Sequence, residues 1–384
     1  MKPYDVIIIG GGASGLYLAA TLGGRLKTAL IERGARVGRK LSATGGGQGN
    51  LSNSGVCADR YFCGDKRLVA DVLGDDNSAV LNMFDGLFVT DARGRIYPAG
   101  RQASSLTDCL RRKASACSCI MTETRVTGLR RGFVVMTDKG ELRADNVAIC
   151  TGGKAGTQFG TDGSAYELVT SLGHTVTPLY PSLVQLKTDT SYIKTLRGVR
   201  TDCFVRAYSG SDFLAEAEGE VIFNDTGVGG NAIYYISPFI AGKPGCRIEL
   251  EFLPGISESE IVSDIKRKEA AGVERGELLS ITLNNVLGRA VIRRAGNGDA
   301  SAIARLVKRF GLTVTGDAGF GGAQVTRGGV PLSEVTDRLE SRLVKGLYFA
   351  GEVLDVDGEC GGYNLHWAFA SAKRVAESLL GEKL

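Results

Sequence analysis

The sequence lacks the features that would place the chain in a membrane, in an oxidising compartment or around a structural metal. No apolar run reaches the roughly 18 residues that a membrane-spanning helix needs, and the short run VIII (residues 6–9) leads into glycines rather than a cleavage site. The nine cysteines are odd in number and form no Cys-x-x-Cys pair. We therefore expect a cytoplasmic location, reduced thiols, no membrane contact and no metal.

A strong excess of one charge is also absent, because the net charge of +4 is too small to indicate a nucleic-acid partner by itself. Glycine is the residue in excess, with 54 of 384 positions, about twice its usual share. Because no collagen-like period accompanies it, this glycine indicates tight turns and close approach of the backbone to a ligand. The length is enough for about two domains.

The first glycine cluster lies between two short apolar runs. The β-branched run at 6–9 is typical of a buried parallel strand, and Gly10, Gly12 and Gly15 then complete the pattern G-x-G-x-x-G. A helical spacing follows, and the second run, TALIE, ends on Glu32. Strand, glycines, helix, strand and acid in this order predict a dinucleotide site.

Each residue of this pattern has a physical role. Gly10 permits the tight turn, Gly12 lets the backbone approach a pyrophosphate, and Gly15 allows close packing of helix against strand. The helix start offers unpaired N–H groups to the anion. Glu32 accepts hydrogen bonds from ribose hydroxyls, which favours a 2′-OH over a 2′-phosphate. FAD and NAD share this pattern, so it leaves the choice between them open.

Three further segments are expected to contact a cofactor. The stretch SATGGGQGNLSN (42–53) is too rich in glycine to contribute much to a core. The buried strand VAIC (147–150) ends in the triplet Thr151–Gly153, a second edge for a dinucleotide. Another apolar strand ends on Glu352, which can hydrogen-bond ribityl hydroxyls. The glycine pair Gly361–Gly362 then precedes a helix whose dipole can stabilise charge on a reduced flavin.

The region between these segments has a different character. Residues 195–254 are strand-like, with the runs CFVRAY, EVIFN, AIYYI and RIELEF, and residues 257–310 are helical. Ser257 with Glu260 makes a capping box at the start of the first helix. From about residue 318 we expect the chain to return to the first domain.

The motifs GGGASG, GRKLSATGGGQGN, FGTDGSAYELVTSLGH, VTRGGVPLSEV and GEVLDVDG followed by GGYN resemble those of one bacterial family. It is the FAD-dependent oxidoreductase family of the aminoacetone oxidases, the BaiN-type 3-dehydro-bile acid reductases and the YhiN-like flavoproteins. The resemblance implies an α/β fold with a doubly wound, Rossmann-like FAD domain (1–186 and 317–384). It also implies an inserted β-barrel domain (187–255) and a small helical subdomain (256–316).

The resemblance also implies non-covalent FAD and the residues that contact it. These residues are Gly10, Gly12, Ala13, Ser14, Gly15, Glu32, Arg33, Lys40, Leu41, Gly45, Gly46, Gly47, Asn50, Val126, Thr151, Gly152, Gly351, Glu352, Gly362, Tyr363 and Asn364. Because the sequence departs from the family pattern at three places, the substrate of a family member is not assigned to this chain. Gln48-Gly49 stands where the family has Arg-Cys, His366 stands where it has Gln, and VIFNDTGVGGNA (221–232) stands where it has LFTHxGxSGP.

The first hypothesis for the chemistry is hydride transfer between FAD and a small organic substrate. It covers reduction of an enone C=C bond with NAD(P)H and oxidation of an amine with O2. The sequence has no second G-x-G-x-x-G for a resident nicotinamide, so either NAD(P)H visits transiently or the substrate itself reduces the flavin.

The candidate catalytic residues are Tyr363 and His366, which both follow the glycine pair. His366 either transfers a proton near neutral pH or only hydrogen-bonds the flavin or a carbonyl group. Tyr363 either acts as an acid or is only a neighbour of the flavin. The second histidine of the chain, His174, is predicted to be structural.

The second hypothesis is reduction of uridine to dihydrouridine in ribosomal RNA. Residues 264–309 contain ten basic side chains against five acidic ones. They either hold phosphates or form a solvated basic face. Only Phe310 adjoins them for base stacking. A third, non-enzymatic hypothesis is a flavin-binding protein without catalysis.

Overall fold

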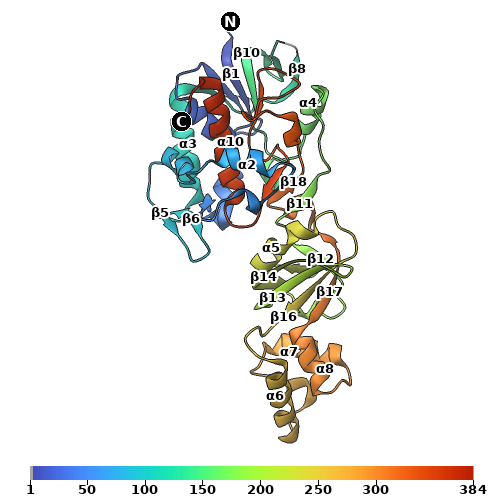
Figure 1. Cartoon of the computed structure of the whole chain (residues 1–384). Coiled ribbons are helices and arrows are strands. Elements are labelled where there is room, and N and C mark those ends of the chain that lie inside the picture. The colour runs from blue at the N-terminus through green and yellow to red at the C-terminus, as the bar shows by residue number, and fades with distance from the viewer. Residues whose placement is uncertain (1–2, 131, 384) are drawn as a thin grey trace. The chain divides into compact units, whose positions relative to one another are not determined.

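The computed structural model describes residues 3–130 and 132–383 and divides into two compact units (Figure 1). Unit 1 contains Met1–Tyr180 and Val325–Leu384, and unit 2 contains Pro181–Gln324. Unit 1 is therefore built from two separate parts of the chain, and unit 2 is one continuous insertion.

Unit 1 is organised around a seven-stranded sheet whose central strands are parallel. The order is β7-β2-β1-β10, with β19 beside β10. Strand β1 is central because its β-branched run buries both faces, as parallel sheets require. β8 and β9 extend the sheet from β10 as an antiparallel hairpin. The strands are β1 (Tyr4–Ile9), β2 (Thr28–Ile31), β7 (Ser118–Met121), β8 (Val126–Arg130), β9 (Val134–Thr137), β10 (Gly140–Ile149) and β19 (Leu347–Phe349).

Helices that are far apart in the sequence pack together in unit 1. Helix α1 (Ala13–Leu22) contacts both α3 (Ala103–Cys117) and α10 (Tyr363–Leu380). The ring of Tyr17 in α1 stacks on Phe369 in α10 with centroids 5.3 Å apart. The indole N–H of Trp367 donates to the carbonyl of Gly351 at 3.2 Å, which ties α10 to the end of β19. This packing joins the two parts of the chain into one core.

Short elements complete unit 1 around this core. They are α2 (Lys66–Leu73), α4 (Ala165–Ser171), β3 (Ser52–Asn53), β4 (Tyr61–Cys63), β5 (Phe88–Thr90), β6 (Arg95–Pro98), β18 (Val325–Arg327) and β20 (Val356–Gly358), with β11 (Tyr180–Ser182) at the unit boundary.

Unit 2 contains a closed antiparallel barrel in the order β12-β15-β14-β13-β16-β17. Alternate residues of its long strands point inward, and Val205, Val221, Ile248 and Phe310 are inaccessible to solvent. The strands are β12 (Leu186–Thr188), β13 (Arg200–Ser209), β14 (Asp212–Phe223), β15 (Gly227–Gly229), β16 (Cys246–Glu251) and β17 (Phe310–Asp317). Together with the parallel sheet of unit 1, this barrel confirms the predicted fold class.

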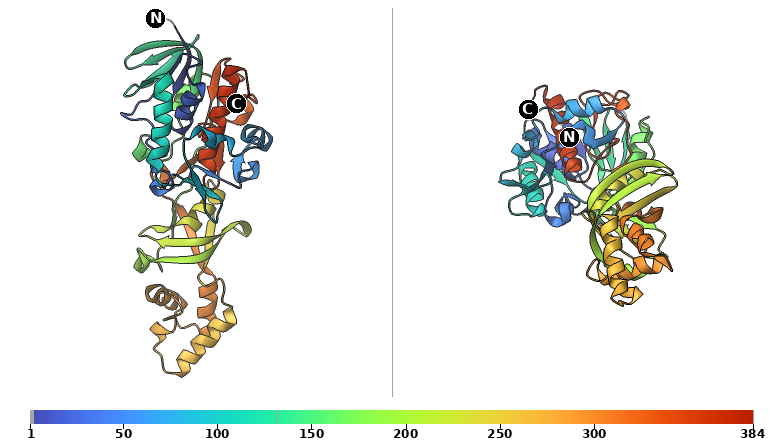
Figure 2. Two further views of the ribbon diagram at one scale, coloured as in Figure 1. Left: turned by 90° about the vertical axis from the view of Figure 1, so that its left-hand side faces the viewer. Right: turned by 60° about the horizontal axis from the view of Figure 1, so that its bottom comes forward.

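Three helices lie between β16 and β17 in the sequence, and Figure 2 shows them in gold and orange at one end of the barrel. They are α6 (Glu258–Ala270), α7 (Asn285–Ala295) and α8 (Ala300–Lys308), and a short turn of helix, α9 (Gly319–Gly322), follows β17. The capping box forms as predicted, because Ser257 accepts from the Glu260 amide and Glu260 accepts from the Ser257 amide. The division of the chain into four segments stays a prediction.

The interpretation of AIYYI as a strand is wrong. These residues belong to helix α5 (Asn231–Ile240), which Gly230 precedes. Isoleucine and tyrosine favour strands, but Ile233, Ile236 and Ile240 recur at helical spacing and are all buried. Burial of this face in unit 2 outweighs the local preference.

Among residues 3–130 and 132–383, no helix has both the length and the apolar character needed to cross a bilayer. The same residues contain no group of three or more His, Cys, Asp or Glu side chains placed to hold a metal. All nine cysteines are free thiols. The cytoplasmic location stays a prediction.

The partly buried Lys268 of α6 provides a test of how a cation stabilises the turn that follows this helix. The Lys268 ammonium donates to the carbonyls of Leu278 (3.1 Å) and Ser280 (2.9 Å) and lies 2.7 Å from the Asp264 carboxylate. We expect Lys268→Ala to cost about 1–3 kcal/mol of unfolding free energy, because it removes the donor to both carbonyls and one of the partners of Asp264, which keeps Arg267 and Thr282. The exposed Lys266 on the same helix is the control, and Lys266→Ala should change stability by less than about 0.5 kcal/mol. Urea unfolding followed by circular dichroism measures both, and equal losses would contradict this role.

Candidate functional site

A cleft of about 500 Å³ lies in unit 1 where β1, β2 and β10 end. Its lining includes Gly10–Gly12 after β1, Glu32 after β2 and Thr151–Gly153 after β10. These strands are parallel, so their carboxyl ends meet at one edge, which is where ligands bind in open α/β sheets.

Glycine is required at the floor of this cleft for reasons of space. Gly10 has φ +106°, and a Cβ there would lie 2.5 Å from the carbonyl oxygen of Cys150. A Cβ on Gly15 would lie 1.9 Å from the carbonyl oxygen of Gly10. Gly12 precedes α1, and no side chain caps the first amides of this helix. The cleft therefore has a floor of bare backbone with an uncapped helix start beside it.

Glu32 is held at the edge of the cleft by two backbone amides. Its carboxylate oxygens accept from Gly11 N at 2.9 Å and from Gly34 N at 2.7 Å. Each oxygen still has capacity for a further bond. The acid is therefore oriented before any ligand binds.

The cleft lining also contains an ion pair between Arg33, an expected FAD contact, and Asp162, which sequence reasoning did not assign to the site. Arg33 donates to Asp162 at 2.7 Å and to the Ser164 hydroxyl at 3.0 Å. Burial alone would raise the pKa of Asp162, but the hydrogen bonds from Arg33 and Ser164 outweigh it and hold this pKa well below its usual range. Asp162 was visible only as part of the motif FGTDGS, whose spacing gives no role to the acid.

Lys40 joins the first and last parts of unit 1. Its ammonium lies 2.8 Å from a carboxylate oxygen of Glu352, and the other oxygen accepts from Thr326 N at 2.8 Å. The Thr326 hydroxyl in turn accepts from the amides of Lys154 and Ala155. Both oxygens of Glu352 therefore hold a protein donor, and Thr326 was part of the motif VTRGGVPLSEV without a predicted role.

The glycine loop, defined here as Gly45, Gly46 and Gly47, follows Leu41 and has left-handed backbone throughout, with φ of +59°, +64° and +87°. A Cβ on Gly46 or Gly47 would meet no atom within 4 Å, so this side of the loop is open. The loop is anchored at its far end by Asn50. In the amide orientation that satisfies both of its groups, Asn50 accepts from Gly362 N at 3.1 Å and donates to Ser52 O at 3.0 Å.

The start of α10 is fixed by hydrogen bonds to the segment before it. Asn364 accepts from Gly358 N and donates to Gly358 O, both at 2.8 Å. The Tyr61 hydroxyl donates to the carbonyl of Tyr363 at 3.0 Å, and the two rings meet edge to face. Asn364 therefore shapes the loop that precedes the helix.

His366 is completely buried. Its Nδ1 lies 2.8 Å from the Ser52 hydroxyl, and its Nε2 has no hydrogen-bond partner among residues 3–130 and 132–383. Burial lowers the pKa of the imidazole to about 4, so the ring is neutral at neutral pH. Its role in proton transfer stays a prediction. His174, in contrast, is bonded on both nitrogens, to Glu334 at 2.7 Å and to Ser341 at 2.8 Å.

The predicted FAD contacts separate into two groups. Those that line the cleft are Gly10, Gly12, Glu32, Arg33, Lys40, Val126, Thr151 and Gly152. The others are absent from its lining, and they are Ala13, Ser14, Gly15, Leu41, the glycine loop, Asn50, Gly351, Glu352, Gly362, Tyr363 and Asn364. Ser14 lies against the end of β19, because its hydroxyl donates to Ala350 O.

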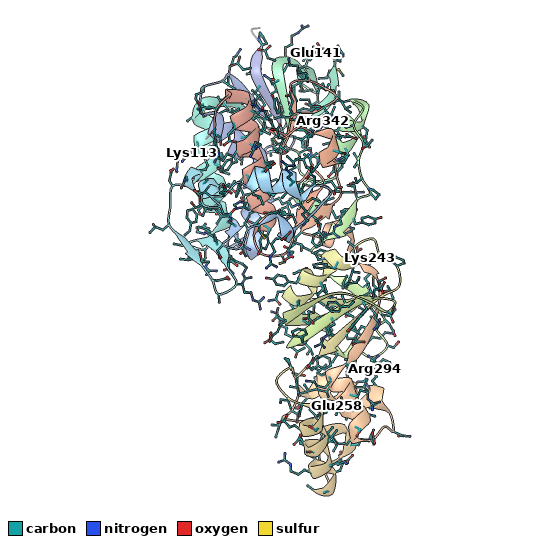
Figure 3. The ribbon with its side chains drawn as sticks, in the orientation of Figure 1. Lys113, Glu141, Lys243, Glu258, Arg294 and Arg342 are labelled. Carbon is teal, nitrogen blue, oxygen red and sulfur yellow. The ribbon has the colours of Figure 1, made fainter. Side chains whose placement is uncertain are left out.

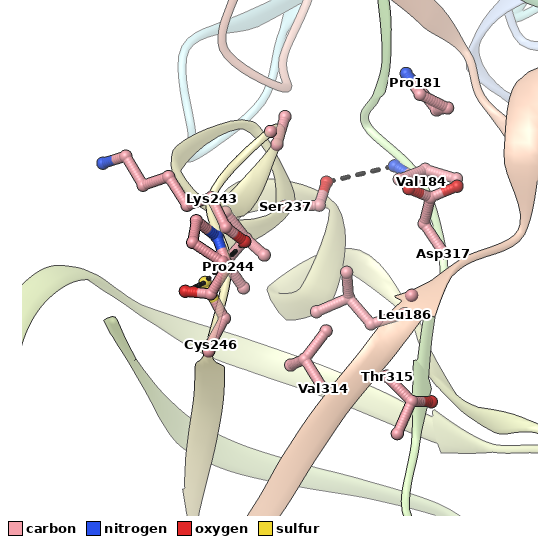
Figure 4. A pocket seen from close by; sticks show the side chains of 15 residues that line it. Pro181, Val184, Leu186, Ser237, Lys243, Pro244, Cys246, Val314, Thr315 and Asp317 are labelled. Atoms are coloured by element: carbon pink, nitrogen blue, oxygen red, sulfur yellow. Dashed lines mark hydrogen bonds between the residues drawn. The ribbon is translucent and has the colours of Figure 1, made fainter. Parts of the chain in front are cut away.

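A second pocket, of about 250 Å³, lies within unit 2 (Figure 4). Apolar residues such as Val184 and Leu186 line it together with polar ones such as Asp317, and the Ser237 hydroxyl accepts from Val184 N at 3.0 Å. None of the predicted site residues lines this pocket.

The burial of His366 gives a pH dependence of known sign. Its folded pKa of about 4 is below the ordinary 6.5, so the unfolded chain binds this proton first as the pH falls. The stability that the neutral ring contributes is complete above about pH 6.5 and decreases toward pH 4. We expect the wild type to lose about 2–3 kcal/mol more than His366→Gln between about pH 7 and pH 4.5. Urea midpoints at the two pH values measure this difference, and parallel losses would contradict it.

Comparison with known proteins gives matches over almost the whole chain. The family described as HI0933-like protein Rossmann domain matches residues 4–378. A Clostridium scindens protein named 3-dehydro-bile acid delta(4,6)-reductase is 35% identical over 397 aligned positions, covering 95% of this chain and 96% of that protein. An Escherichia coli protein named ribosomal RNA dihydrouridine synthase is 27% identical over 415 aligned positions, covering 100% of both.

A solved structure supports the fold alone. The 3-ketosteroid delta1-dehydrogenase from Sterolibacterium denitrificans matches with a TM-score of 0.53 at 11% identity, covering 99% of this chain and 100% of that one.

The family match and the 35% identical reductase confirm the predicted family and enzyme class. The protein is an FAD-dependent oxidoreductase, as its glycine-floored cleft also indicates. The chain belongs to the HI0933-like family of proteins with a Rossmann domain.

Proposed function

We propose that the protein reduces a C=C bond conjugated to a carbonyl group in a small organic substrate, with FAD as the hydride carrier. The observation that carries the proposal is the glycine-floored cleft in a chain 35% identical to a named 3-dehydro-bile acid reductase. Bound FAD supplies the hydride chemistry, and the protein supplies orientation and exclusion of water.

The cleft residues fit the adenosine and pyrophosphate parts of FAD. Bare backbone at Gly10 and Gly12 allows close approach of a pyrophosphate, and the uncapped start of α1 offers it amide donors. The carboxylate of Glu32, held by two amides, accepts from the ribose hydroxyls. Thr151 and Gly152 form the facing edge.

The flavin part is proposed to lie along the glycine loop and the start of α10. The open side of Gly46 and Gly47 admits a ligand against the backbone, and their amides can donate to it. α10 contains 18 residues and begins after Gly362, so its positive end favours negative charge on a reduced ring. Asn50 follows the glycine loop and accepts from Gly362 N just before α10, so it holds the two segments together.

His366 is proposed to position these segments. A neutral ring that is completely buried is poorly suited to proton transfer at neutral pH, but its bond to Ser52 fixes the strand that follows Asn50. Tyr363 stays a candidate proton donor. NAD(P)H is proposed as a transient donor of electrons, because the sequence has no second dinucleotide pattern.

A second candidate function is reduction of uridine in RNA, which the name of the Escherichia coli relative favours. The basic region 264–309 supports it weakly, because many of its cations already hold partners in unit 2. Arg275 donates to Gly296 O and Gly298 O, Lys308 donates to Leu253 O, and Arg294, labelled in Figure 3, lies over the Phe310 ring at 4.3 Å. Cations in such contacts are less available to phosphates.

The proposed position of the flavin predicts that Gly46→Val weakens FAD binding at least about tenfold, because a branched side chain projects into the open side of the loop. The control is Gly210→Val in unit 2, where φ is +59° and a Cβ also meets no atom within 4 Å. Both variants carry similar backbone strain, so only the first should lose FAD. Titration of the apoprotein with FAD measures this difference. Equal FAD affinity in the two variants would contradict the placement.

The proposed reaction predicts oxidation of NADH or NADPH that depends on an added enone. We expect turnover with a steroid-like 3-keto-Δ4 enone, and turnover at the uncoupled background rate with uridine-containing RNA or with an amine under oxygen. Absorbance of the nicotinamide under anaerobic conditions measures turnover with the enone and with RNA, and oxygen consumption measures turnover with the amine. Turnover with RNA alone would replace this proposal with the second candidate.

A further inference from the structure

One arginine next to the glycine loop is held in an unusual backbone conformation. Arg101 has φ +49°, in the left-handed region that residues other than glycine rarely adopt. It closes a tight turn, since its amide donates to the carbonyl of Pro98 at 2.8 Å, and α3 begins two residues later. Strain of this kind persists where the surroundings fix the residue, and it concentrates at functional sites.

Two neutral groups orient the guanidinium of Arg101. Its Cζ lies 4.1 Å from the centroid of the buried Tyr97 ring, and its Nη1 donates to the amide oxygen of Gln48 at 3.3 Å. It forms no ion pair with any carboxylate in residues 3–130 and 132–383, and it is exposed. Arg95, near the same ring, instead pairs with Asp91 at 2.7 Å. Arg101 therefore keeps an uncompensated charge and free N–H donors.

The turn and the glycine loop are locked together by close packing. Gly49 has φ +78°, and a Cβ there would lie 3.0 Å from both Ala103 Cα and Leu106 Cδ1. A side chain at position 49 would therefore be strained and would press on the start of α3. This contact also fixes the distance between the start of α3, with Arg101 before it, and the loop that ends at Gly47.

We propose that Arg101 is a substrate-recognition residue whose guanidinium binds the carboxylate of an anionic organic substrate beside the glycine loop. The proposal rests on the proposed function, because it requires the flavin to lie along that loop. A planar, oriented guanidinium without an acidic partner suits a carboxylate, which it can bind through two parallel hydrogen bonds. Gln48, which directly follows the glycine loop, helps to hold Arg101 in place.

The test measures equilibrium binding to the FAD-loaded protein without a reductant. The ligands are a 3-keto-Δ4 steroid carboxylic acid and its methyl ester, and perturbation of the flavin spectrum reports binding of each. We expect the wild type to bind the acid about tenfold more tightly than the ester, and Arg101→Gln to bind both alike. Arg111→Gln, which removes a charge further along α3, is the control and should keep the preference.

Two further variants separate this role from a structural one. Arg101→Gly removes both the guanidinium and the strained side chain, so we expect an unchanged or higher melting temperature together with loss of the preference for the acid. The exchange Gln48→Arg with Arg101→Gln returns a guanidinium to the loop and should restore that preference.

Several outcomes would overturn the proposal. They are equal binding of acid and ester by the wild type, no spectral response to either ligand, a preference that survives both Arg101 variants, and no recovery in the exchange variant. A shift of the flavin midpoint potential in Arg101→Gln with unchanged ligand preference would assign the charge to the flavin instead. Absence of turnover with NADH or NADPH, while the acid still binds preferentially, would refute the proposed function and leave this inference standing.

Discussion

The close approach of three backbone segments at the end of β1 is the constraint on which the rest of the structure depends. Gly10 lies against the carbonyl of Cys150, and Gly15 lies against the carbonyl of Gly10. Both contacts are so close that a Cβ would clash with the carbonyl oxygen. Side chains at these positions would push α1 away from the sheet, so their absence provides helix–sheet packing. Gly12, where a Cβ would meet only the Cys150 carbonyl at 3.9 Å, leaves the backbone accessible to a pyrophosphate.

The second constraint is that the site needs both parts of unit 1. The Lys40–Glu352 pair and the Asn50 bridge to Gly362 each join a residue from the first 50 positions to one beyond position 350. The stacking of Tyr17 on Phe369 does the same in the core. Insertion of unit 2 between these parts leaves the cofactor region intact. Its barrel and helices have a core of their own, with residues such as Val205 and Ile303 inaccessible to solvent.

The sequence predicted the strand–helix–strand unit beneath the cleft because the signals of this unit are local. Glycines, β-branched runs and the acid at position 32 follow one another within one strand–helix–strand unit, so spacing alone identifies them. The long-range contacts had no such signal. Thr326 and Asp162 act through partners far away in the sequence, and both oxygens of Glu352, expected to meet ribityl hydroxyls, hold Lys40 and the Thr326 amide. The segment AIYYI was wrongly predicted as a strand, because burial of one helical face in unit 2 outweighed the strand preference of its residues.

The central claim is that this frame of bare backbone holds FAD. The most direct measurement is the visible spectrum of the purified protein, recorded before and after incubation with FAD and removal of the excess, with the flavin then released by denaturation and quantified. The account predicts one FAD per chain, bound without a covalent bond and fully released on unfolding. Protein that retains no flavin after this treatment, while its circular dichroism shows it folded, would contradict the account.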